Sequence, residues 1–140
     1  MNNLEAITKR IQEFARCRHE VLAVYLFGSA LVRERPRDLD IALVVRRIDL
    51  GVGQGAYGYR AAVTAELMQL LGRNEIDVVL LHEASPLLCK EILRKGKLLY
   101  AGSGYNRIGM EKQIMDRYLD TAPLRTIKER YLKHRYLGHD

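Results

Sequence analysis

The chain has 140 residues, of which 48% are hydrophobic and 29% are charged, and its formal net charge is +6. This composition is typical of a soluble globular domain and excludes a disordered chain, because enough apolar side chains are present to form a core. No apolar run approaches the roughly 20 residues of a membrane-spanning helix, and the first residues lack the layout of a signal peptide. The basic excess favours anionic partners without choosing among nucleotides, RNA and acidic proteins.

The two cysteines, Cys17 and Cys89, lie far apart in the sequence and form neither a CxxC pair nor a metal-binding pattern with histidine. Isolated cysteines of this kind are typical of reduced, partly buried thiols. Together with the missing export and membrane signals, they predict a cytoplasmic protein that makes no membrane contact.

The first third of the chain alternates between helix and strand patterns. Residues 3–16 carry apolar side chains at helical spacing, which predicts an amphipathic helix. Residues 21–27 form a short apolar run, rich in β-branched and aromatic side chains, that ends at Gly28 and predicts a buried strand. Residues 29–35 predict a short helix or turn, and residues 38–45 predict a second strand.

The middle of the chain continues the alternation. Residues 49–58 contain four glycines and predict a flexible loop, followed by a helix over residues 59–71. Residues 75–81 predict a third strand. A serine N-cap and a first-turn proline then open a predicted helix that runs to about residue 94, and residues 97–100 predict a short edge strand.

The tail of the chain predicts two further helices, over residues 107–119 and 123–136, so that residues 107–137 form a helical tail. Basic residues crowd residues 124–135, either as the solvated face of a helix packed on the core or as a docking surface for a partner protein or its RNA. The alternation of strands and helices predicts one α/β (α+β) domain over residues 1–140, with a small mixed sheet flanked by helices.

Three aspartates stand at corresponding places in two of the predicted strands. Asp38 and Asp40 are two residues apart at the start of one strand, so their side chains point the same way, and Asp77 is the third residue of the next predicted strand. If those strands are neighbours, the three carboxylates share a pocket. Like charges held together are costly, and a hard cation such as Mg²⁺ relieves that cost while leaving positions open for a substrate phosphate.

Gly28 and Ser29 directly follow the first predicted strand. A glycine there lets a phosphate approach the backbone, and a serine at a helix start offers a hydroxyl beside free N–H groups. Arg33, Arg35 and Arg37 lie between this pair and the aspartates and are candidates to neutralise phosphate charge. Each feature alone is common in strand ends and turns, but their combination in this order indicates a phosphoryl-transfer site.

The chain resembles the polymerase-beta-like nucleotidyltransferase superfamily, in particular its minimal members. The resemblance rests on Gly28-Ser29, the Asp38-x-Asp40 pair and the later Asp77, within the stretches YLFGSALVRERPRDLDIALVV and NEIDVVLLHEASPLLCKEILRKGKLLYAG, and on the tail YLDTAPLRTIKERYLKHR. It covers most of the chain. The eight-residue spacer between Ser29 and Asp38 contains no glycine and is shorter than is common in the family, which predicts a different turn on the phosphate side.

The resemblance implies an enzyme that transfers AMP from ATP, with Asp38, Asp40 and Asp77 as the catalytic and Mg²⁺-binding residues, two metal ions, and Gly28 and Ser29 at the nucleotide phosphates. Minimal members of the family are often encoded beside a HEPN-family RNase, which is the toxin. In such pairs the nucleotidyltransferase is identified as the antitoxin, and it modifies a tyrosine of the toxin. The implied partner is therefore a HEPN toxin, in a hetero-oligomer, with RNA contact only through the partner.

Two other functions remain open from the sequence. The chain is alternatively a non-catalytic antitoxin that inhibits its partner by binding, or a nucleotidyltransferase that acts on a small molecule or an RNA end. The intact set of three carboxylates favours an enzyme over a pure binding protein.

Overall fold

The computed structural model describes residues 4–31, 38–46 and 55–120 of the chain. Within these ranges, four strands form one sheet: β1 (Val21–Phe27), β2 (Leu39–Val45), β3 (Ile76–Leu80) and β4 (Lys97–Ala101). The α-helices of the described residues that surround it are α1 (Leu4–Arg16), α2 (Gly55–Leu71), α3 (Pro86–Lys95) and α4 (Arg107–Asp120). The short 3₁₀ helices η1 (Gly28–Leu31) and η3 (Leu81–Glu83) follow β1 and β3.

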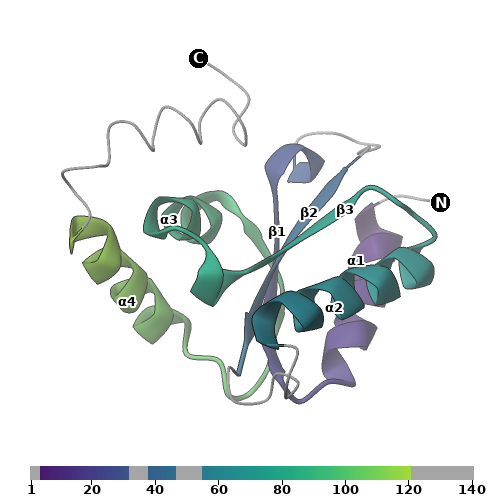
Figure 1. The fold of residues 1–140 in the computed structure, drawn as a ribbon, viewed down its shortest axis with the longest axis horizontal. Coiled ribbons are helices and arrows are strands. Elements are labelled where there is room, and N and C mark those ends of the chain that lie inside the picture. The colour runs from purple at the N-terminus through teal and green to yellow at the C-terminus, as the bar shows by residue number, and fades with distance from the viewer. Residues whose placement is uncertain (1–3, 32–37, 47–54, 121–140) are drawn as a thin grey trace.

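The sheet is mixed, with the strand order β3-β2-β1-β4. β1 pairs antiparallel with both β2 and β4, whereas β2 and β3 are parallel and are joined through α2. Figure 1 shows the sheet between two layers of helices. The predicted α/β class with a small mixed sheet is therefore confirmed.

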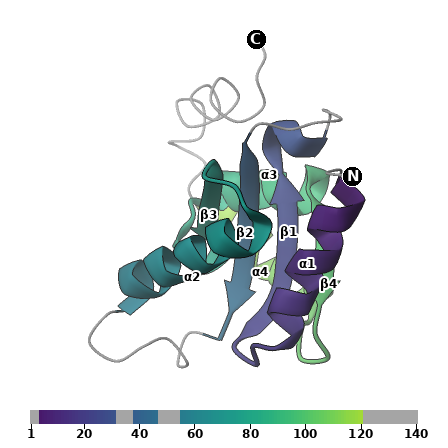
Figure 2. The same ribbon diagram turned by 90° about the vertical axis from the view of Figure 1, so that its right-hand side faces the viewer.

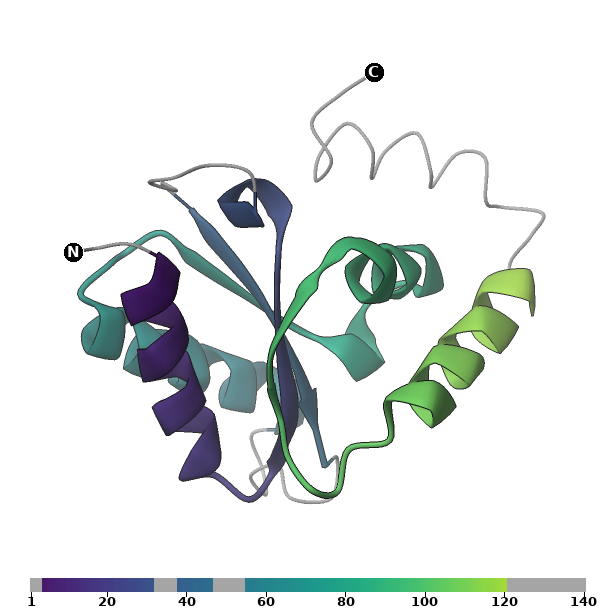
Figure 3. The same ribbon diagram turned by 180° about the vertical axis from the view of Figure 1, so that it is seen from behind.

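The helices cover opposite faces of the sheet. α1 and α2 pack on one face, and α3 and α4 pack on the other, as Figures 2 and 3 show from two further sides. Because side chains alternate along a strand, Leu39, Ile41 and Leu43 of β2 enter the core under α1 and α2, and Ala42 and Val44 enter the core under α3. The even-numbered positions of β2 thus belong to the α3 and α4 face.

Most predicted elements agree with the structure to within one or two residues, but the middle helix does not. α2 begins at Gly55, four residues before the predicted start, so Gly58 lies in a helix and not in a loop. Glycine costs about 1 kcal/mol in a helix, but burial of Val63 and Leu67 stabilises the helix as a whole. Leu70, on the same helix, is 37% exposed.

Several sequence predictions fall outside the described residues. These are the part of the first short helix beyond Leu31, most of the glycine-rich stretch, and the second tail helix with its basic residues. The single-domain organisation over residues 1–140 therefore remains a prediction. Among the helices that the structure describes, none has the length and apolar character needed to cross a lipid bilayer.

The cysteines differ from each other in environment. Cys89 is buried, its thiol lies 3.1 Å from the carbonyl oxygen of Leu81, and burial raises its pKa to about 11. Cys17 is exposed, which corrects the expectation that both thiols are partly buried.

Helix α3 begins with the predicted cap. The Ser85 hydroxyl oxygen accepts a hydrogen bond from the backbone N–H of Leu88 at 3.2 Å, and Pro86 occupies the first turn. We expect Ser85→Ala to lower the free energy of unfolding by about 1 kcal/mol, because one N–H of the first turn loses its acceptor. Urea denaturation measures the change, with Ser103→Ala in the exposed turn before α4 as the control. Equal destabilisation by the two variants would contradict this role for the cap.

Candidate active site

Asp40 and Asp77 lie next to each other in neighbouring strands. They are direct partners in the parallel register of β2 and β3, where strands run about 4.8 Å apart. Asp40 is two residues before Ala42, whose side chain enters the core under α3, and Asp77 is the register partner of Asp40. The two carboxylates therefore lie on the same face of the sheet, the one that α3 packs on. The structure thereby meets the condition on which the sequence argument depended, that the third predicted strand lies beside the second.

Asp38 stands at the entrance to the same pair of strands. It lies in a bend one residue before β2, and the following residue, Leu39, donates its backbone N–H to the carbonyl oxygen of Glu75 at 3.0 Å. This bond extends the β2–β3 ladder back to the level of Asp38. Asp38 and Asp77 are exposed and Asp40 is half-buried, so the carboxylate oxygens are accessible to solvent.

Gly28 and Ser29 close the other side of Asp40. Phe27, the last residue of β1, is the antiparallel partner of Asp40, so the chain turns into η1 directly beside this carboxylate. Gly28 has a φ of +82°, a conformation that favours glycine. A Cβ at Gly28 would overlap Oδ2 of Asp40 and would lie 3.1 Å from its Cγ. Ser29, the second residue of η1, is exposed.

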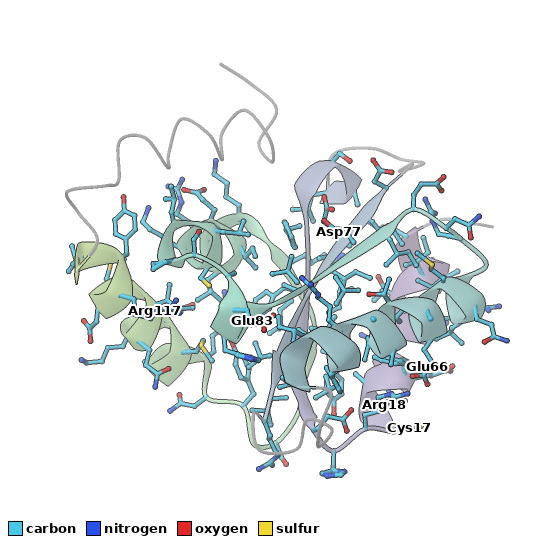
Figure 4. All side chains as sticks on the ribbon, in the orientation of Figure 1. Cys17, Arg18, Glu66, Asp77, Glu83 and Arg117 are labelled. Atoms are coloured by element: carbon cyan, nitrogen blue, oxygen red, sulfur yellow. The ribbon has the colours of Figure 1, made fainter. Side chains whose placement is uncertain are left out.

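These residues meet at one end of the sheet. β1 ends there and β2 and β3 begin there, so Gly28, directly after β1, meets Asp40 of β2, which is paired with Asp77 of β3. Figure 4 places Asp77 at the end of the sheet that carries η1. The neighbouring Phe27, which sequence reasoning did not single out, flanks Asp40 on the side away from Asp77, and only the β1–β2 register reveals this pairing.

The aspartates are neighbours in the sheet, but their side chains do not converge into a complete set of metal ligands. Within residues 4–31, 38–46 and 55–120, no three His, Cys, Asp or Glu side chains converge on a common point that suits a metal ion. The oxygen-only donors and their exposure nevertheless match what Mg²⁺ prefers in nucleotide sites, where few protein carboxylates and several other oxygens share the ion. Arg33, Arg35 and Arg37 lie outside the described residues.

A groove of about 630 Å³ lies elsewhere, between α1 and α2 on the opposite face of the sheet. Figure 4 shows Cys17, Arg18 and Glu66 in that region, far from Asp77. Arg18 pairs with Glu66 and lies 4.7 Å from the centre of the Phe14 ring, so charged side chains of the groove bind one another. The groove contains none of the predicted site residues, and we do not assign the phosphate chemistry to it.

The fold and these carboxylates define a nucleotidyltransferase-like α/β protein, and comparison with known families agrees. The family model described as "Polymerase beta, Nucleotidyltransferase" matches residues 9–104, well over half of the chain and all of Gly28, Ser29 and the three aspartates. The chain belongs to the polymerase beta nucleotidyltransferase family. No curated protein sequence matches the chain significantly.

Solved structures show the same fold. A chain from the complex of a tri-AMPylated Shewanella oneidensis HEPN toxin with an MNT antitoxin is 22% identical, with a TM-score of 0.67 over 94% of this chain and 99% of that one. A chain from a toxin–antitoxin structure with AMP-PNP is also 22% identical, with a TM-score of 0.67 over 89% and 98%. A chain from the toxin–antitoxin structure MntA-HepT is 21% identical, with a TM-score of 0.65 over 91% and 98%.

Proposed function

We propose that this chain is the antitoxin of a toxin–antitoxin pair and neutralises a HEPN-family RNase by transferring AMP from ATP to one of its tyrosines. The observation that carries the proposal is the pairing of Asp40 with Asp77 beside Gly28, in a chain of the nucleotidyltransferase family. Similar folds in the complex of an AMPylated HEPN toxin with an MNT antitoxin, and in a toxin–antitoxin structure with AMP-PNP, support a toxin protein as the acceptor and ATP as the nucleotide.

Asp38, Asp40 and Asp77 would hold Mg²⁺, and we expect two ions. When bound, the metal supplies charge neutralisation for the triphosphate and lowers the pKa of the attacking hydroxyl. Gly28 lets the nucleotide approach the backbone beside Asp40, and the exposed Ser29 offers a hydroxyl to a phosphate oxygen. Asp77, at the outer strand, acts as a ligand or as the base that accepts the hydroxyl proton.

The bonds made and broken follow from the products. The tyrosine oxygen attacks the α-phosphorus of ATP, the bond from that phosphorus to the bridging oxygen breaks, and pyrophosphate leaves. The tyrosine proton passes to a carboxylate or to solvent. We expect the antitoxin and toxin to form a hetero-oligomer in the cytoplasm, where ATP is available, with RNA contacted only by the toxin.

The test uses the purified chain, the product of the adjacent gene, Mg²⁺ and ATP labelled either at the α- or at the γ-phosphate. We expect label from α-labelled ATP on a tyrosine of the partner, none from γ-labelled ATP, and no transfer after EDTA treatment. A tight complex without transfer would instead identify a binding antitoxin. Transfer only to a small molecule or an RNA end would reject the protein acceptor.

A further inference from the structure

Helix α4 exposes most of the large apolar side chains found at the surface of the described residues. Of the four large hydrophobic residues that are exposed there, three lie on α4: Ile108 is 81% exposed, Leu119 is 56% exposed and Met115 is 42% exposed. Exposed apolar side chains gathered on one element indicate an interaction surface more often than isolated ones do.

The three side chains form one line along the helix. At 100° per residue, positions 108, 115 and 119 lie within about 40° of one another. We call these three residues the α4 seam. About 100° around the helix from this line, Ile114 and Tyr118 are buried in the core cluster that also contains side chains of α3 and β1. In Figures 1 and 3, α4 forms the outer edge of the molecule, so its outer side is not covered by any described helix or strand.

Salt bridges flank the α4 seam on both sides. Arg107 and Glu111 lie 2.9 Å apart on one side, and Lys112 and Asp116 lie 3.4 Å apart on the other. Because the charges on each side neutralise each other, the rim has no net sign that would attract a polyanion such as RNA or an acidic membrane surface. A narrow apolar line between mixed charges matches a helix of another protein, as in helix-in-groove and coiled-coil contacts.

The helix that carries the seam is held firmly from its inner side. The hydroxyl groups of Tyr25 and Tyr105 lie 2.7 Å apart at the start of α4, and burial raises the pKa of both, so both stay neutral. Near the end of α4, Arg117 donates to the carbonyl oxygen of Ala84 at 3.2 Å. A partner therefore meets a preformed surface, which lowers the ordering cost of binding.

We infer that the α4 seam receives a helix of the protein whose hydroxyl is the acceptor. The inference rests on the proposed function, because it assigns the docking surface of that same partner. Asp40 and Asp77 lie on the sheet face that α3 and α4 cover, so a protein seated on α4 stays on the side where transfer takes place.

The test changes the seam without changing net charge. Ile108→Glu combined with Leu119→Lys places each charge at the helix end that favours it. The control is Gln113→Glu, at an exposed position about 140° away around α4. We expect the seam variant to bind the product of the adjacent gene at least about 10-fold more weakly than the control does, by calorimetry. In transfer assays, KM for the partner should rise while kcat is retained, because the aspartates are untouched.

The outcomes separate this inference from the proposed function. Unchanged binding by the seam variant would overturn the seam assignment and leave the transfer activity standing. Seam-dependent binding without any transfer by the unaltered chain would support the seam and remove the activity. A dimer of the isolated chain that the seam variant dissociates, measured by light scattering, would assign the seam to a second copy and overturn the inference. A fall in Tm of several degrees relative to the control would mean that the seam is packed within the chain itself, and would likewise overturn the inference.

Discussion

Asp40→Asn is expected to lower the rate of AMP transfer by at least about 100-fold, because the metal-assisted step depends on charge neutralisation worth several kcal/mol. Asp40 lies between Phe27 and Asp77 in the sheet and directly beside Gly28, so it links the phosphate side of the site to the carboxylate of β3. Asn retains the size of the side chain but removes the charge. Single-turnover assays with α-labelled ATP and saturating partner measure the effect on the chemical step.

The fold is expected to survive this change. Like charges directly opposite each other in a sheet are destabilising, so removing one of the Asp40–Asp77 pair leaves the Tm unchanged or raises it. The control, Asp116→Asn, makes the same chemical change at an exposed position on α4, where the ion pair with Lys112 stabilises by a few tenths of a kcal/mol. Transfer at the unaltered rate by Asp40→Asn, with a retained fold, would remove these carboxylates from the mechanism.

Local patterns in the sequence predicted the strands well. The apolar, β-branched run ending at Gly28 and the alternation that begins at Asp38 each correspond to a strand of the structure, and Ser85 caps α3 as its place before Pro86 indicates. The start of α2 was predicted wrongly because the closely spaced glycines of residues 49–58 indicate a flexible loop, whereas the helix begins at Gly55. Burial of Val63 and Leu67, which sequence spacing cannot measure, stabilises the helix.

The site required information that is not local. That Asp38 and Asp40 share a side follows from the two-residue period of a strand, but the position of Asp77 depends on which strand lies beside β2 and in which direction. The parallel pairing of β2 and β3 brings Asp77 to Asp40. The contact between Gly28 and Asp40 depends likewise on the antiparallel β1–β2 register, and no spacing rule predicts it.

The α4 seam shows a further limit of pattern analysis. Apolar residues at helical spacing predicted the helix over residues 107–119, but such spacing does not tell which apolar side chains find a covering element. Ile114 and Tyr118 are covered by the core, whereas Ile108 and Leu119 are exposed. Sequence reasoning placed the candidate docking surface in the basic residues 124–135, which lie outside the described residues.

Gly28→Ala is expected to reduce both transfer and stability, and Gly72→Ala separates the two causes. Both glycines have a positive φ, +82° for Gly28 and +65° for Gly72, so an alanine strains the backbone at either position by about 1 kcal/mol. At Gly72 a Cβ meets nothing within 4 Å, whereas at Gly28 it overlaps the Asp40 carboxylate. The comparison therefore isolates the close approach of Gly28 to Asp40.

We expect Gly72→Ala to lose about 1 kcal/mol and to keep its transfer rate, because the strain lies away from the site. Gly28→Ala should lose at least about 1 kcal/mol more, since η1 or the Asp40 side chain must move to admit the methyl group. A displacement of about 1 Å at the reacting groups costs on the order of 100-fold in rate, so transfer should fall by that factor. Urea denaturation and single-turnover transfer measure the two effects. If both variants lose the same stability and both retain transfer, the contact between Gly28 and Asp40 has no part in shaping the site, and the phosphate must approach elsewhere.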